Sequence, residues 1–314
     1  MALDDLERDN LPRWHPQRRN FFESYVLSWN DPRQKIAGWL RYSLLAPAAR
    51  DPEVTLSGFF FDSSDPTQNR DLQETVPIRS LRSENEIFYF ATPTAAIYQT
   101  GARGELKSQQ DQLSWELKLQ EPIVSLRHFP KTFYQLPWPS TKLVAPHLSC
   151  RISGEFTVNQ KKFSLDAVPG HQAHLWGTAR ARRWVWGHCN SFEDPSAVFE
   201  GFSVSDKLTL LFFVYQGKRY SFLSPWHWSQ NKSLPGEHRW HFESAAGEFR
   251  FIGDLFTDPK QMMTVRYEDP DGTWREARDT KVADLKIQVL KKGRDWELVD
   301  TLTAQKSAAF EVVR

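Results

Sequence analysis

Apolar and polar residues alternate with a period of two along most of the chain. Residues 113–120 and 283–289 show the pattern most clearly, because every second residue is apolar and the residues between are polar. Successive side chains of a strand point to opposite faces, so each segment predicts an antiparallel strand with one face in the core. The predicted inward positions are Leu113, Trp115, Leu117, Leu119, Ala283, Leu285, Ile287 and Val289.

Turn residues separate these patterns at short intervals. Gln216-Gly217-Lys218 and residues 269–272 each lie between two strand-like runs and predict hairpins. Amphipathic helices are nearly absent, since residues 91–99 and 258–263 predict short helical turns at most. Further strand patterns occupy residues 23–29, 37–45, 54–61, 151–158, 197–204 and 247–254.

Many short strands with frequent turns predict an all-β protein built from antiparallel barrels or sandwiches. The chain has 314 residues and more strand patterns than one small barrel can use. We therefore expect two β domains in tandem, with residues 1–183 forming the N-terminal domain and residues 184–314 the C-terminal domain.

Residues 127–147 form a proline-rich segment with four prolines. Proline lacks a backbone donor, so the segment predicts neither a central strand nor a helix interior. It is either a solvent-exposed connector or a segment that wraps over and closes the end of a cavity. The second interpretation rests on four aromatic residues that are costly to leave in water, Phe129, Phe133, Tyr134 and Trp138.

Charge and cysteine content restrict the class of protein. The chain has 40 Lys and Arg against 39 Asp and Glu, so there is no electrostatic reason to expect nucleic acid or an anionic membrane as partner. No apolar run is long enough to span a membrane, and the first residues lack an apolar signal core, so we expect a cytoplasmic location. Cys150 and Cys189 are expected to be free thiols, although a disulfide between them is possible.

Aromatic residues make up 14% of the chain, with 13 tryptophans, and residues 174–192 concentrate three of these with two histidines. Read as strands, this stretch and the residues before it separate into faces. Trp184, Trp186, His188 and Asn190 share one face of the second strand, opposite Val185, Gly187 and Cys189. In the first strand Gln172, His174 and Trp176 share one face, opposite His171.

If these two strands are neighbours, His174, Trp176, Trp186, His188 and Asn190 line one cavity. Its walls would be mostly aromatic rings with a few polar tips, which suits a large apolar ligand held in place at one end. The alternative is a filled barrel in which the polar groups satisfy the backbone. A metal site is not expected, because His171 and His174 point to opposite faces of their strand and form a poor chelate.

Two further residues are candidates. Glu200 stands among apolar neighbours and shares a face with Phe202 and Val204, so it is an acid or the partner of a histidine, or else an edge carboxylate facing water. Trp226 is expected on a strand face together with Trp228, in contact with the ligand.

At these residues the chain resembles the superfamily that includes tocopherol cyclase and the hydroxyneurosporene synthases, or carotenoid 1,2-hydratases. The Trp-x-Trp-x-x-Cys-Asn element of the cyclases is matched by Trp184, Trp186, Cys189 and Asn190. The His-x-Trp element of the hydratases is matched by His174 and Trp176, although Leu175 stands where relatives often have Asn. The resemblance implies two tandem lipocalin-like domains, a lipophilic and often isoprenoid ligand, and chemistry without a redox cofactor.

The resulting hypothesis is an enzyme that hydrates, cyclises or isomerises a carbon–carbon double bond of a lipophilic substrate. His188 or His174 would be the acid and Glu200 would orient it. Trp176 and Trp186 would face the developing cation, Asn190 would position the nucleophile, and Gln172 and Trp226 would contact the substrate. The alternatives are a non-catalytic binding protein for a hydrophobic small molecule and an interaction module with a filled core. Transient contact of the aromatic loops with a membrane, and the oligomeric state, stay open.

Overall fold

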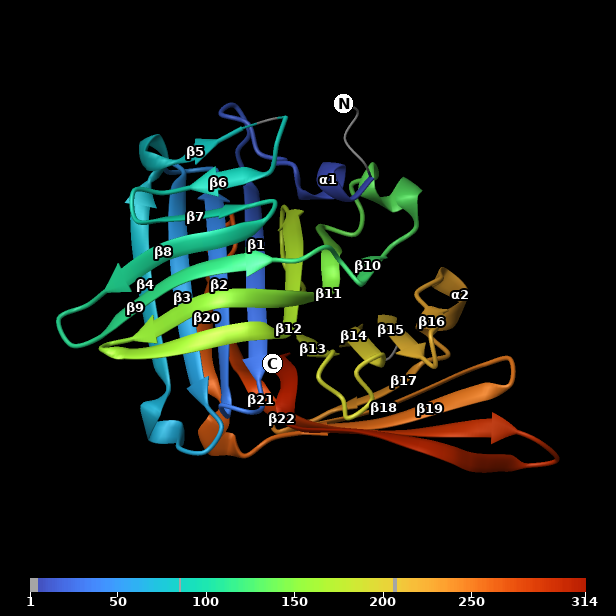
Figure 1. The fold of residues 1–314 in the computed structure, drawn as a ribbon. Coiled ribbons are helices and arrows are strands. Elements are labelled where there is room, and N and C mark those ends of the chain that lie inside the picture. The colour runs from blue at the N-terminus through green and yellow to red at the C-terminus, as the bar shows by residue number, and fades with distance from the viewer. Residues whose placement is uncertain (1–4, 85, 206–207) are drawn as a thin grey trace.

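The computed structural model describes residues 5–84, 86–205 and 208–314. Antiparallel strands make up most of the described residues, and they form two large sheets (Figure 1). Within the described residues, no helix combines the length and the apolarity that crossing a bilayer requires.

The first sheet contains twelve strands of the described chain. They are β1 (Phe21–Asp31), β2 (Ile36–Ala46), β3 (Glu53–Asp62), β4 (Arg70–Pro77), β5 (Arg82–Ser83), β6 (Tyr89–Ala91), β7 (Ala95–Tyr98), β8 (Gly101–Lys107), β9 (Gln112–Leu119), β10 (Val124–Arg127), β11 (Thr141–Val158) and β12 (Lys161–Gly177). Their order is β4-β3-β2-β1-β12-β11-β9-β8-β7-β6-β5, and β10 pairs with β11. In Figure 1 the blue strands β1–β4 stand upright, and the green hairpin of β8 and β9 reaches across them.

The second sheet contains ten strands among the residues described. They are β13 (Trp184–Cys189), β14 (Val198–Ser205), β15 (Leu208–Tyr215), β16 (Lys218–Phe222), β17 (Lys232–Pro235), β18 (Arg239–Ala246), β19 (Phe249–Phe256), β20 (Met263–Glu268), β21 (Trp274–Lys292) and β22 (Trp296–Val313). Their order is β16-β15-β14-β13-β22-β21-β19-β18-β17, and β20 pairs with β21. The chain passes from one sheet to the other between Gly177 and Trp184, while the division into domains at residue 183 stays a prediction.

Helical segments are short. They are α1 (Asp5–Asn10), α2 (Pro225–Trp228), and the 3₁₀ turns η1 (Pro66–Gln68), η2 (Ile78–Ser80), η3 (Lys131–Tyr134) and η4 (Pro259–Gln261). The turn predicted at residues 258–263 is confirmed by η4. The turn predicted at residues 91–99 is wrong, because residues 95–98 form β7 between β6 and β8 and bury apolar side chains there.

The two predicted hairpins are present. Gln216 and Gly217 join β15 to β16 with φ of 49° and 72°, the left-handed backbone that a tight hairpin turn requires. Residues 269–273 join β20 to β21, with Gly272 at φ 84°. Both turns therefore depend on the residue types that the sequence places there.

Each sheet encloses its own apolar core. In β9 the side chains of Leu113, Trp115 and Leu117 are buried in the first core, as the alternation predicts. In β21 the predicted inward residues are buried in the second core with Phe242, Phe251 and Leu302. Burial of alternate apolar side chains is the main stabilising term in both.

The proline-rich segment differs from its prediction in one half. Its first half is irregular and contains η3, but β11 begins at Thr141, so the second half is a strand. Pro146 is tolerated because the register of β11 against β12 shifts between Val144 and His147, and a bulge needs no ladder hydrogen bond from proline.

The two sheets pack against each other through mixed clusters of apolar residues. One cluster joins Leu143 and Ala173 of the first sheet to Leu210 and Phe212 of the second. A second cluster joins residues of β2 and β3 to residues of β20, β21 and β22. Side chains also bond across the interface, since Asn190 Nδ2 donates to the carbonyl of Gly170 at 2.7 Å.

Candidate functional site

A cavity of about 280 Å³ lies between the two sheets, and we call it the chamber. Its volume is near the lower end of the range for small-molecule sites. Apolar residues of both sheets make up much of its wall, and a few charged groups interrupt them. The apolar residues include Val26, Leu143, Ala173 and Leu175 of the first sheet and Trp186, Phe202, Val204 and Leu210 of the second.

Strand parity explains which side chains face the chamber. In β12, Ala173 and Leu175 point toward it together with His171, two residues before Ala173. In β14, Glu200 does so with Phe202 and Val204, the face on which the sequence places it. The proline-rich segment contributes Phe129, Trp138 and Pro139 to the lining, which favours the interpretation of a segment that wraps over a cavity.

Glu200 is the centre of a buried hydrogen-bonded cluster in the chamber wall. It is 2% exposed. Its Oε1 accepts from His128 Nε2 at 3.0 Å and from Trp186 Nε1 at 2.9 Å, and its Oε2 accepts from His188 Nδ1 at 3.0 Å. Burial alone would raise the pKa of Glu200, but the bonds from His128 and His188 outweigh it and hold the pKa below its usual range. Glu200 is therefore a carboxylate at neutral pH.

The pairing of strands produces this cluster. His188 of β13 stands directly opposite Glu200 of β14, so the two side chains share one face. His128 comes from the proline-rich segment, 72 residues away in sequence. Sequence reasoning missed His128, because nothing in the local pattern around it shows which strand it meets.

His171 joins the Glu200 cluster to a second, smaller cavity. Its ring centroid lies 4.4 Å from that of His188. Burial, and then the neighbouring His188, hold the pKa of His171 well below its usual value, so the ring is neutral at physiological pH. The smaller cavity, about 20 Å³, is lined by His171, His188, Asn30 and Asn190 among others. That volume and that polar lining suit one water molecule.

A second buried polar cluster lies along the same wall. Glu311 accepts from Trp184 Nε1 at 2.6 Å and from the hydroxyl of Tyr267. Lys281 Nζ lies 2.6 and 2.7 Å from the two carboxylate oxygens of Asp279. Burial, with the nearby Glu311, outweighs Lys281 and raises the pKa of Asp279 to about 7. Asp279 therefore keeps its proton up to about neutral pH, whereas Glu200 is ionised there.

The two tryptophans of β13 link the two clusters. Trp184 and Trp186 lie on one face of the strand, and each indole N–H donates to a different carboxylate. Because a strand rises about 3.3 Å per residue, their Cα atoms are about 7 Å apart along β13. Lys281 lies 5.2 Å from the ring of Trp186 and is also paired with Asp279. Glu200, an ionised carboxylate, therefore lines the chamber, and the proton-holding Asp279 does not line it but pairs with Lys281, which does.

The expectation that His174 and Trp176 share a cavity with His188 is wrong. β12 and β13 belong to different sheets, and the opposite face of β12, which carries His171, meets β13. His174 points into the core of the first sheet, where its Nε2 lies 2.8 Å from Glu23 Oε1 and its ring stacks on Tyr25 at 4.2 Å.

The other residues on that face of β12 hold the N-terminal segment in place. Gln172 and Asn10 exchange two side-chain hydrogen bonds, at 2.9 and 3.2 Å. Trp176 packs under the guanidinium of Arg13, 5.0 Å from the ring centroid. Gln172, His174 and Trp176 are therefore away from the chamber.

Trp226 is also misplaced by the strand prediction. Residues 225–228 form α2, not a strand, because Pro225 begins a helical turn after Ser224. Trp226 is 68% exposed and does not line the chamber. Trp228 is the residue of this pair that packs inward, against Phe133 and Trp138.

One group of residues has the proximity that a metal ion needs. Ligand atoms of His171, His188 and Glu200 lie within 4.8 Å of one another in the described part of the chain. Both oxygens of Glu200 already accept hydrogen bonds from ring nitrogens. His188 is itself one of these donors, so in this arrangement Glu200 and His188 are bonded to each other. The donor set fits an acid–base cluster better than a metal centre.

Cys150 and Cys189 are both buried free thiols, as predicted. Burial raises the pKa of each to about 12. Neither is a reactive thiolate at neutral pH.

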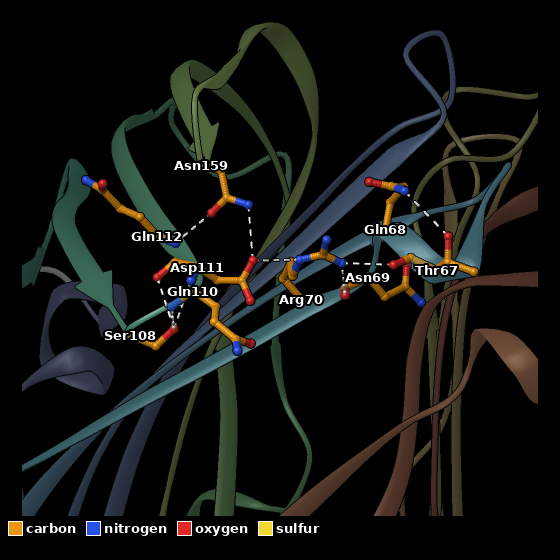
Figure 2. Close-up of polar contacts among 9 residues, drawn as sticks. All are labelled: Thr67, Gln68, Asn69, Arg70, Ser108, Gln110, Asp111, Gln112 and Asn159. Atoms are coloured by element: carbon orange, nitrogen blue, oxygen red, sulfur yellow. Dashed lines mark hydrogen bonds and ion pairs between the residues drawn. The ribbon is translucent and has the colours of Figure 1, made fainter.

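A larger hollow, about 660 Å³, lies at the turns that end β8 and β11. Figure 2 shows that its polar groups bond to one another: Arg70 Nε lies 2.8 Å from Asp111 Oδ1, and Asn159 Nδ2 donates to the same oxygen at 3.1 Å. These contacts tie neighbouring turns together at the surface. The polar groups of this hollow are therefore bonded to one another, and we take the chamber as the candidate site.

The sequence has relatives in Mycobacterium tuberculosis. Two uncharacterized proteins of Mycobacterium tuberculosis, MT0513 of strain CDC 1551 and Rv0493c of strain H37Rv, are each 24% identical over 317 residues. The match covers 96% of this chain and 90% of each relative.

Solved structures share the fold at low sequence identity. CghA superposes with a TM-score of 0.63 at 10% identity, over 99% of this chain and 93% of CghA. A Nitrosomonas europaea protein assigned as an AttH superposes with a TM-score of 0.56 at 12% identity, over 100% of this chain and 97% of that protein. These likenesses confirm the all-β, lipocalin-like fold.

A family described as tocopherol cyclase-like matches residues 97–313, which include the chamber's β12, β13 and β14. The suspected resemblance is thereby confirmed over more than half of the sequence. The chain belongs to the tocopherol cyclase-like family.

Proposed function

We propose that this protein is a cofactor-independent cyclase or isomerase that acts on a lipophilic, isoprenoid-like molecule in the chamber. The observation that carries the proposal is Glu200, an ionised carboxylate held by three donors in the wall of an apolar cavity. A buried charge is costly unless it is paired, and such arrangements are concentrated at functional sites. Membership of the tocopherol cyclase-like family supports the same class of chemistry.

Glu200 is suited to stabilise positive charge on a substrate. His128, His188 and Trp186 fix its orientation before the reaction, so no reorganisation is needed when charge develops. The ring of Trp186 also lines the chamber and adds roughly 0.5–2 kcal/mol for a cation over its face. The wall thus favours a carbocation over a neutral alkene.

The proton comes from the other end of the same wall. Asp279 keeps its proton up to about pH 7 and interacts with Glu311, which lines the chamber beside Tyr267 and passes that proton on. Transfer of that proton to one alkene carbon leaves the cation on its neighbour. Loss of a different proton then gives an isomer. Attack by a hydroxyl or alkene of the same substrate gives a ring, and in each case a proton returns to the protein.

His188 and His171 provide a place for the returning proton or for water. His188 donates through Nδ1 to Glu200, which leaves Nε2 as an acceptor beside the smaller cavity. Asn190 lines the same cavity, so it can position a nucleophile there. His174 and Trp176 receive no role, because they lie on the other face of β12.

The test begins with the substrate. Organic extraction of the purified protein and mass spectrometry identify the lipophile that it carries, and turnover is then followed with that compound. We expect Glu200→Gln to lower turnover by about 100-fold or more, comparable to the removal of one electrostatic contact from a transition state.

The matched control is Glu116→Gln, the same change at an exposed strand position. It should leave turnover unchanged, and circular dichroism should show that both variants are folded. Full turnover by a folded Glu200→Gln variant would contradict the proposal. Return of the extracted lipophile unchanged after long incubation with the wild-type protein would favour a binding protein instead. The cytoplasmic location, the absence of nucleic-acid partners and transient membrane contact stay predictions.

A further inference from the structure

We propose that Arg41 is a binding site for a carboxylate, so that the chamber's ligand is an amphipathic acid with a lipophilic tail. The inference rests on the proposed function, because it takes the chamber as the ligand site. It adds the chemical class of the ligand's polar end.

Arg41 is a buried arginine with few hydrogen-bond partners. It lies in β2, is 6% exposed and lines the chamber. Among the described residues its side chain has one hydrogen bond, a long one of 3.4 Å from Nη2 to Ser57 Oγ, and its Nε has no partner. A guanidinium carries five donors and stays charged, so burial with so few partners is costly unless a ligand supplies acceptors.

The other charged groups in the wall have partners of their own. Lys281 pairs with Asp279, and Arg180 Nη1 lies 2.8 Å from Asp269 Oδ1. Glu200 is held by its three donors. Glu311 is held by Trp184 and Tyr267. In the part of the chain that the structure describes, no carboxylate lies within ion-pairing distance of Arg41.

Aromatic rings hold the guanidinium in place. The Arg41 Cζ lies 4.6 Å from the ring centroid of Tyr267 and 5.8 Å from that of Trp39, and all three residues line the chamber. Packed against these rings, an arginine keeps its planar fork oriented, and the fork matches the two oxygens of a carboxylate. The apolar remainder of the chamber then accommodates the tail.

The position of Arg41 also orients the substrate. Tyr267 packs on Arg41 and donates its hydroxyl to Glu311, so the head group lies at the proton-holding end of the wall. A tail that extends from Arg41 along the apolar wall passes the carboxylate of Glu200. One end of the molecule is thereby fixed while a double bond in the tail meets the reacting groups.

The experiment uses the full chain at pH 7.5 with a neutral lipophilic dye, N-phenyl-1-naphthylamine. The dye reports whether the chamber binds apolar molecules at all. Decanoate and 1-decanol are then compared as competitors, since they share a tail and differ in the head group. We expect decanoate to displace the dye at a concentration at least about tenfold lower than 1-decanol, as for a buried charge pair.

Variants of Arg41 test whether this residue causes the preference for decanoate over 1-decanol. Arg41→Gln should raise the concentration of decanoate that displaces the dye by at least about tenfold, because the charged contact is lost. The concentration of 1-decanol that displaces the dye should stay within about twofold. Arg41→Lys keeps the charge without the fork and should retain part of the preference. Arg103→Gln, at an exposed position of β8, is the matched control and should change neither competitor. If Arg41→Gln fails to fold, comparing the two competitors on the wild-type protein and on Arg41→Lys still shows whether Arg41 recognises the carboxylate.

The possible failures are distinguishable. Equal displacement by decanoate and 1-decanol, with the dye bound, would overturn the role of Arg41 and leave the chamber as an apolar site. A preference for decanoate that survives in a folded Arg41→Gln variant would also overturn it. No binding of the dye would overturn the chamber as a ligand site, and with it both proposals.

Discussion

At the scale of single residues, the protein treats two buried carboxylates in opposite ways. Glu200 accepts hydrogen bonds from three ring N–H groups, and these stabilise its charged form. For Asp279, burial first and the nearby carboxylate of Glu311 second outweigh Lys281 and favour the protonated form. Two carboxyl groups with pKa values moved apart by their surroundings can divide the work of an acid and a charge stabiliser.

The pKa of Asp279 predicts a pH effect on stability. The folded protein keeps the proton up to about pH 7, whereas the unfolded chain releases it near pH 4. Between these values the folded state binds more protons, so this group's stabilisation is full below about pH 4 and is lost as the pH rises toward 7, by about 1.4 kcal/mol per pH unit. Asp279→Asn removes this dependence.

Urea unfolding of the wild type and of Asp279→Asn between pH 4 and 8 checks this. We expect the free energy of unfolding of the variant to increase relative to that of the wild type as the pH rises toward 7. For Asp71→Asn, at an exposed position of β4, the free energy of unfolding should differ from that of the wild type by the same amount at every pH. A constant difference between Asp279→Asn and the wild type over this range would contradict the raised pKa.

At the scale of one element, β13 joins the site to the core. Trp184, Trp186 and His188 face the polar clusters, and Val185 and Cys189 are buried in the core of the second sheet. Gly187 is on the core side as well. A Cβ at that position would lie 2.5 Å from a methyl carbon of Leu255 and 3.2 Å from the ring of Trp240. The small residues on the core face of β13 allow the strand to pack closely, so that the two tryptophans and His188 on the other face contact the carboxylates.

Gly187→Ala should therefore destabilise the fold. Overpacking of a filled core typically costs about 1–3 kcal/mol, and the shift of β13 away from Leu255 would also lengthen the bonds to Glu200. Thermal unfolding checks the loss of stability. Gly293→Ala, in an exposed turn where a Cβ meets nothing closer than 3.6 Å, should leave the melting temperature unchanged. Equal melting temperatures for both variants would show that β13 has room to move.

At the scale of the whole molecule, the alternation of apolar and polar residues predicted most strands and the correct faces of β9, β13 and β21. It did not predict which strands are neighbours. β12 and β13 follow one another closely in sequence and look like partners, yet they lie in different sheets that pack face to face. That error put His174 in the site in place of His171.

Contacts between residues distant in sequence could not be predicted for a related reason. His128 and Arg41 come from segments far from the tryptophan-rich stretch, and only the packing of the two sheets brings them to the chamber wall. Trp226 was misplaced because an alternating pattern of four residues also fits one helical turn. Glu200 could be predicted, because a carboxylate among apolar residues of a strand indicates a buried partner.

A crystal structure of the protein soaked with 8-bromooctanoate tests the chamber most directly, because anomalous scattering locates the bromine without ambiguity. We predict a bromine peak between the sheets, among Trp186, Phe202 and Leu210, with the carboxylate at Arg41. A bromine located in the hollow beside Arg70, or inside the apolar core of either sheet, would contradict this prediction.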